Sequence, residues 1–157
     1  MKKFFLLILF ILICQLPGII GSVFTVSAIP GWYAYLQKPA FNPPNWIFGP
    51  VWISLYTMMG ISLFLIWLKK KEYKLAKPAI ILFLFHLILN GAWSILFFGL
   101  KNPLLALIDI FFLWLIIIIL VWQFWLIRKP AAYLLFPYLA WVSFAMVLNF
   151  EIWRLNP

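Results

Sequence analysis

Several polar and aromatic side chains recur at helical spacing inside otherwise apolar segments, and their types could recognise a ligand. His86, Asn90 and Trp93 are spaced i, i+4 and i+7, so they share one face of a helix. Two further sets share a face in the same way: Trp52, Tyr56 and Met59, and Tyr138, Trp141, Ala145 and Asn149. Because indole offers a broad π-face and one N–H donor, these residues suit a flat, mostly apolar molecule.

The same residues are predicted to lie at similar depths. At a rise of about 1.5 Å per residue, Trp52 and Trp93 lie roughly 10 Å from the same end of their segments, Asn90 roughly 13–15 Å and Trp141 roughly 16–18 Å. One layer drawn from three segments would form a pocket. The alternative is an aromatic belt at the membrane interface, which better suits the tryptophans near segment ends, Trp67, Trp122, Trp125 and Trp153. Periodicity alone leaves both interpretations open.

Three isolated groups, Asp109, His86 and Cys14, are candidate functional residues. Asp109 is an ionisable group inside an apolar segment, which indicates a functional site unless the carboxylate caps or crosslinks helices. His86 has no second histidine, cysteine or acid at ligand spacing in its own segment, so we expect a hydrogen bond between helices. Cys14 is the only cysteine and is expected to pack inertly. We therefore predict no metal site and no cofactor.

Composition defines the class of protein. The chain has 157 residues, of which 68% are hydrophobic and 10% are charged, which excludes a typical soluble domain and a disordered chain. A membrane-spanning helix needs about 20 residues. We predict an all-α membrane protein, a bundle of five transmembrane helices that forms a single domain over residues 1–157.

Apolar runs separated by prolines give the approximate spans. They cover residues 4–26, 46–68, 79–100, 104–127 and 131–153, with a long first loop over residues 27–45. Proline is tolerated at the start of a helix but distorts the interior of one. Pro17 and Pro137 fall inside spans, so we expect kinks there.

Charge predicts the orientation. Nine of the 12 Lys and Arg residues fall on the side of the N-terminus and three on the other side. Because cytoplasmic loops are enriched in Lys and Arg, we expect a multi-pass protein of the plasma (inner) membrane with a cytoplasmic N-terminus and an external first loop and C-terminus. The net charge of +9 is then a signal of topology and not of nucleic-acid binding.

The first apolar run also fits a signal peptide, because Lys2 and Lys3 precede it. We favour a retained span, since the run exceeds 20 residues. In addition, small and polar residues fall near one face of it: Gln15, Gly18, Ser22 and Thr25. Such a stripe favours helix packing in lipid.

Longer motifs resemble a known family. The segment WYAYLQKPAFNPPNWIFGPVW, residues 32–52, closely resembles the signature of the translocator protein / tryptophan-rich sensory protein (TspO/MBR) family. Further stretches agree: residues 90–93, 97–99, 107–109 and 137–156. The resemblance runs from about residue 15 to the end, and the chain is identified as a bacterial member of the family.

The resemblance implies a five-helix bundle, often a homodimer, whose first loop acts as a lid over a pocket for porphyrins, haem, sterols or synthetic ligands. Carried over by motif, the ligand-binding residues are Tyr33, Trp52, Asn90, Trp93, Trp141 and Ala145, to which we add Tyr56. We expect the loop to be ordered over bound ligand and looser without it. The animal sterol-recognition stretch corresponds to Leu148, Phe150 and Arg154, but its tyrosine is replaced by Phe150, which weakens the case for sterol.

Three functions remain open. The first is binding of protoporphyrin IX or haem in porphyrin transport, sensing or a stress response. The second is an enzyme that degrades protoporphyrin in light and oxygen, for which Trp52 and Trp141 are the candidate catalytic residues. The third is a sterol-binding or structural membrane subunit. We find no residues for acyl transfer or ATP hydrolysis, and we expect no nucleic-acid partner.

Overall fold

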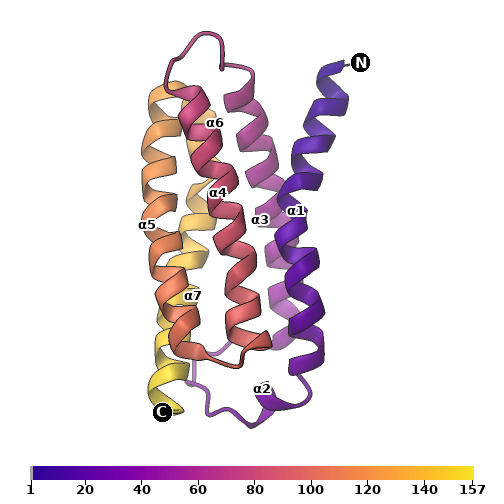
Figure 1. Ribbon diagram of the computed structural model, residues 1–157, viewed down its shortest axis with the longest axis vertical. Helices are drawn as coiled ribbons and strands as arrows, with labels where there is room; N and C mark the ends of the chain where they lie inside the picture. Colours follow the sequence, from indigo (N-terminus) through magenta and orange to yellow (C-terminus); the bar gives the residue numbers. More distant parts are fainter. Residues whose placement is uncertain (1) are drawn as a thin grey trace.

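The computed structural model describes residues 2–157, and these form helices and no strands (Figure 1). Five helical units are long and apolar enough to cross a membrane, which confirms the predicted fold class and places the chain in a lipid bilayer. The units are α1 (Lys2–Ala28), α3 (Asn45–Trp67), α4 (Ala76–Ser94) continued by the π-helix η1 (Ile95–Gly99), α5 (Pro103–Ile127), and α6 (Lys129–Tyr133) followed by α7 (Phe136–Leu155). A short helix, α2 (Trp32–Tyr35), lies within the first loop.

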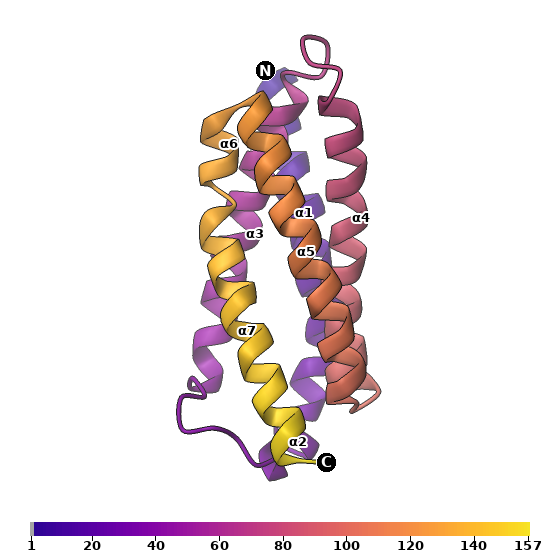
Figure 2. The ribbon, with the colours of Figure 1, turned by 90° about the vertical axis from the view of Figure 1, so that its left-hand side faces the viewer.

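The connections gather at two opposite ends of the bundle. The N-terminus, the α3–α4 connection and α6 lie at one end, and α2 and the C-terminus lie at the other (Figures 1 and 2). The end that carries the N-terminus therefore holds nine of the 12 Lys and Arg residues. We call the opposite end the first-loop end.

The fifth span is broken where we had expected a kink. The chain leaves the helix at Leu134 and Leu135, between α6 and α7. Pro137 lies in the first turn of α7, where its missing N–H removes no helical hydrogen bond. The distortion expected at Pro137 is thus a break between α6 and α7 directly before this residue, and Pro17 lies inside α1 as predicted.

Helices α1 and α3 cross in close contact near their middles. A Cβ atom on Gly60 would lie 2.5 Å from Cα of Ile11, and a Cβ on Gly18 would lie 2.6 Å from the Tyr56 ring. Between these points Gln15 Nε2 donates hydrogen bonds to the Ile53 carbonyl and the Thr57 hydroxyl, both at 3.2 Å. Small residues permit this approach, because helix association in lipid depends on close packing and hydrogen bonds.

The crossing predicts that an alanine substitution lowers stability at one glycine of α3 but not at another. Gly60→Ala forces α1 and α3 apart, because the contacted atoms belong to the Ile11 backbone, and should lower the free energy of unfolding by about 1–3 kcal/mol. Gly49→Ala is the matched control, since nothing lies within 4 Å of a Cβ there. Thermal unfolding in detergent checks this, and equal midpoints for the two variants would contradict the packing.

Candidate ligand-binding site

A cavity of about 540 Å³ lies between the helices in the half of the bundle nearest the first loop. All seven residues predicted to bind ligand line it: Tyr33, Trp52, Tyr56, Asn90, Trp93, Trp141 and Ala145. They come from α2, α3, α4 and α7. The layer predicted from spacing is thus a cavity wall, and its size falls within the range of small-molecule sites.

Asn90 joins three helices at the deep side of the cavity. Tyr56 of α3 donates a hydrogen bond to Asn90 Oδ1 at 2.5 Å, and Asn90 Nδ2 donates to the Tyr138 hydroxyl of α7 at 3.0 Å. All three side chains are buried. A buried polar group away from water needs such partners, so this network fixes the positions of the rings around it.

Trp52 packs against both tyrosines of this network, Tyr56 and Tyr138. Its indole stacks on Tyr56 with centroids 5.2 Å apart and planes 27° apart. It also meets the edge of Tyr138 at 6.3 Å. Trp52 therefore forms an aromatic wall whose orientation depends on the two tyrosines that bond to Asn90.

The other two cavity indoles differ in their N–H groups. Trp93 Nε1 donates to Asn149 Oδ1 at 3.0 Å, and its ring stacks on Phe97 at 5.0 Å. Trp141 contacts Phe48 edge-on at 5.9 Å, yet its Nε1 is buried and has no acceptor among the described residues. A buried donor without a partner is costly, so Trp141 offers the cavity a hydrogen bond that a ligand oxygen or nitrogen would satisfy.

Tyr33 brings the first loop onto the cavity. Its ring is 5% exposed and packs against Phe98 with centroids 5.5 Å apart. Its hydroxyl donates to Asn42 Oδ1 at 3.2 Å. Burial raises the pKa of the Tyr33 phenol, and the bond to Asn42 opposes this shift, so the group stays a neutral donor.

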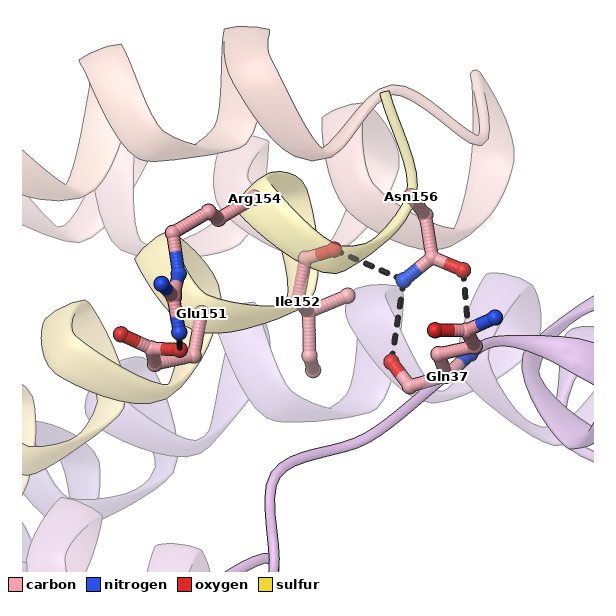
Figure 3. Close-up of polar contacts among 5 residues, drawn as sticks. All are labelled: Gln37, Glu151, Ile152, Arg154 and Asn156. Carbon is pink, nitrogen blue, oxygen red and sulfur yellow. Dashed lines mark hydrogen bonds and ion pairs between the residues drawn. The ribbon is translucent and has the colours of Figure 1, made fainter.

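Asn156, the residue before the C-terminal Pro157, ties the first loop to α7 (Figure 3). The amide N–H of Gln37 donates to Asn156 Oδ1 at 3.0 Å, and Asn156 Nδ2 donates to the Gln37 carbonyl at 2.9 Å. The same nitrogen also bonds the Ile152 carbonyl at 2.8 Å. One side chain thus satisfies both backbone groups of Gln37, and we call this pair the loop anchor.

Two groups of lining residues were missed as site residues. The α1 stripe was interpreted as a packing face, but it also forms the cavity wall through Gln15, Gly18, Ser22 and Thr25. Phe97 and Phe98 line the wall from the π-helix η1, which continues α4. π-Helical turns often mark functional sites. The helical spacing of the α1 stripe could have identified the first group as lining residues. Helical periodicity gave no indication of η1 and so could not identify the second group.

The three residues of the sterol-recognition stretch and Asp109 do not come together in one site. Leu148 is buried and lines the cavity, whereas Phe150 faces outward and lines a separate groove. Arg154 pairs with Glu151 at 2.6 Å (Figure 3), so the three positions of the sterol stretch form no single site. Asp109 is buried in α5 but is not a lining residue.

His86 and Cys14 are both fully buried. His86 Nδ1 bonds the Phe83 carbonyl of its own helix, and its Nε2 has no partner among the described residues. The expected hydrogen bond from His86 to another helix is therefore wrong. Cys14 packs in the core beside α3, as predicted for an inert thiol.

Comparison with known proteins settles the family. A sequence profile described as TspO/MBR family matches residues 10–154. The chain belongs to the TspO/MBR family. The Tryptophan-rich protein TspO of Chlorobaculum tepidum is 44% identical over 99% of both chains. The Translocator protein of Bos taurus is 38% identical over 94% of this chain and 88% of its own.

A third member of the family is the Tryptophan-rich sensory protein of Cereibacter sphaeroides, which is 32% identical over 96% of this chain and 91% of its own. The resemblance inferred from residues 32–52 and the later motifs is thus confirmed over nearly the whole chain. The cavity lies within the matched region, because its lining residues run from Gln15 to Ile152.

The polar network predicts a graded loss of stability. Asn90→Ala removes two hydrogen bonds between helices and should cost about 1–3 kcal/mol, since such bonds contribute about 0.6–1.7 kcal/mol each in membrane proteins. Tyr138→Phe removes one and should cost about half as much. Unfolding in mixed micelles measures both. Equal stability of Asn90→Ala and the wild type would contradict the network.

Proposed function

We propose that this TspO/MBR member binds a tetrapyrrole, protoporphyrin IX or haem, in the cavity beneath the first loop, and acts in porphyrin transport, sensing or a stress response. The observation that carries the proposal is an aromatic cavity with one unsatisfied donor, Trp141 Nε1. Flat conjugated rings with nitrogen and oxygen acceptors match this chemistry. The names of two relatives, Tryptophan-rich sensory protein and Translocator protein, support binding followed by signalling or transfer.

Charge supports one orientation of the ligand. None of the residues that line the cavity is acidic or basic. Carboxylates are costly at membrane depth, so a porphyrin would place its ring between Trp52 and Trp141 and its propionates toward the first loop. Lys38 lies there, with Nζ 4.6 Å from the centre of the Tyr33 ring.

A second candidate function is photo-oxidative degradation of protoporphyrin with dioxygen as the oxidant. Its support is the stacked pair Trp52 and Tyr56, together with Trp141 on the same cavity. Electron-rich rings in contact with an excited porphyrin can donate electrons to it. Light-dependent, irreversible loss of porphyrin absorbance separates this function from reversible binding.

Ligand binding tests the proposal. Protoporphyrin IX should quench tryptophan fluorescence with micromolar affinity. Trp141→Ala removes a desolvated aromatic anchor and should weaken binding by roughly thirtyfold, equivalent to about 2 kcal/mol. Trp141→Phe keeps a ring but loses the N–H, so its effect should be smaller.

Trp114→Ala is the matched control for this titration. Its indole lies outside the cavity lining and already donates to Ser143 Oγ at 2.8 Å. The affinity of Trp114→Ala for protoporphyrin IX should equal that of the wild type. Equal losses in Trp141→Ala and Trp114→Ala would overturn the assignment of the site.

We also propose that the N-terminus is cytoplasmic and the first loop external, because nine of 12 basic residues gather at one end. Single-cysteine variants Asn45→Cys and Glu72→Cys, made with Cys14→Ala, test this in intact cells. A membrane-impermeant thiol reagent should label position 45 and spare position 72. Labelling of position 72 alone would reverse the orientation.

A further inference from the structure

The exposed part of the cavity wall is confined to two helices. Among the lining residues, every one that is exposed belongs to α1 or α3. These are Ile19, Ser22, Val26, Asn45, Trp46, Gly49 and Ile53. Ile19 and Ile53 are each 61% exposed, although both belong to the wall of a cavity. The cavity therefore opens sideways between α1 and α3.

The opening reaches membrane depth. Ile53 lies eight residues beyond the start of α3 at Asn45, which places it about 12 Å along the helix from that end. At this depth the gap ends, because Gln15 Nε2 donates hydrogen bonds to the Ile53 carbonyl and to the Thr57 hydroxyl one turn further along α3. The closest contact between α1 and α3, at Gly60 and Ile11, lies on the N-terminal side of this point, and Figure 2 shows the two helices separating toward the first-loop end.

Three other sides of the cavity are closed by contact. Between α1 and α4, a Cβ on Gly21 would lie 2.7 Å from Ser94 Oγ. Between α5 and α7, Leu113 and Val142 are at most 1% exposed. Between α3 and α7, the ring of Phe48 meets that of Trp141. No comparable opening is found along these three sides in residues 2–157.

The end toward the aqueous phase is covered by the first loop. Tyr33 packs on Phe98, and Trp32 meets the edge of Phe97 at 5.6 Å. The loop anchor holds Gln37 through both of its backbone groups. The loop is thus fastened to both η1 and α7, whereas nothing comparable joins the outer halves of α1 and α3.

We propose that the gap between the outer halves of α1 and α3 is a lateral portal, through which an amphiphilic ligand dissolved in the bilayer enters the cavity while the first loop stays anchored. The inference rests on the proposed function and narrows its ligands to molecules that partition into lipid. The rim of the portal is formed by Ile19, Ser22, Gly49 and Ile53. Their side chains are small or apolar, which suits passage of an apolar ring from lipid.

The test narrows the portal from each side. Gly49→Phe adds a ring where no atom lies within 4 Å of a Cβ, and Ser22→Phe does so from α1. Protein in nanodiscs is mixed with vesicles loaded with protoporphyrin IX, and tryptophan quenching is followed by stopped flow. Both variants should slow association and dissociation by about tenfold each, because an obstruction raises the same barrier in both directions.

Two variants serve as controls. Val23 is the neighbour of Ser22 in the chain, is 69% exposed and does not line the cavity. The association and dissociation rates of Val23→Phe should therefore match those of the wild type. Asn156→Ala removes the loop anchor. If the ligand entered beneath a moving lid, this change would accelerate association, whereas the portal predicts an unchanged association rate.

Two results would overturn the portal. One is faster association in Asn156→Ala with unchanged rates in Gly49→Phe and Ser22→Phe. The other is an effect of the two portal variants on dissociation alone, which would make them ordinary wall contacts. Thermal unfolding of each variant confirms that the compared proteins are folded.

Failure of the proposed function is distinguishable from failure of the portal. If protoporphyrin IX does not quench the wild type, the tetrapyrrole proposal fails. The portal is then tested with Ala145→Cys in a Cys14→Ala background, since Ala145 lines the cavity. An apolar maleimide dissolved in the bilayer should label it, and Gly49→Phe should slow that labelling about tenfold. Equal labelling rates would overturn the portal.

Discussion

The rest of the site depends on the hydrogen bonds that the side-chain amide of Asn90 makes to two other helices. In lipid, apolar side chains gain little from meeting one another, so helix association relies on packing and hydrogen bonds. Asn90 supplies such bonds to α3 through Tyr56 and to α7 through Tyr138. Trp52 in turn stacks on Tyr56. The position of an aromatic wall thus follows from one buried amide.

The bundle divides into a tightly packed part and an open part. Toward the N-terminal end, Gly60 allows the backbones of α1 and α3 to touch, and Gln15 crosslinks them. Beyond this contact the two crossing helices diverge, and the space between them becomes cavity. The same crossing that holds the bundle together therefore also creates the space for a ligand.

Much of this arrangement could be predicted from the sequence. Long apolar runs define the five units, and helical spacing placed Asn90 and Trp93 in one layer with Trp52 and Trp141, all of which line the same cavity. These predictions succeed because they depend only on helical periodicity and rise. The motif in residues 32–52 added the family, which periodicity cannot supply.

The rest depended on contacts between helices, which no single segment encodes. The N–H of Trp93 is satisfied by Asn149, which is 56 residues away in the chain, whereas that of Trp141 has no acceptor among the described residues. The loop anchor joins Gln37 to Asn156 across 119 residues. His86 was expected to bond another helix, but its ring bonds its own turn at Phe83. The short helix before the break at Pro137 is held by a contact from α3, in which Ser62 Oγ donates to the Ala131 carbonyl at 2.7 Å.

The most direct test of the account is an experimental structure of the protein with protoporphyrin IX in a lipid environment. The account predicts ligand density between Trp52 and Trp141, with an acceptor atom within hydrogen-bonding distance of Trp141 Nε1 and the propionates toward Lys38. Density confined to the outer groove of α5 and α7, lined by Leu107, Phe111 and Phe150, would contradict it.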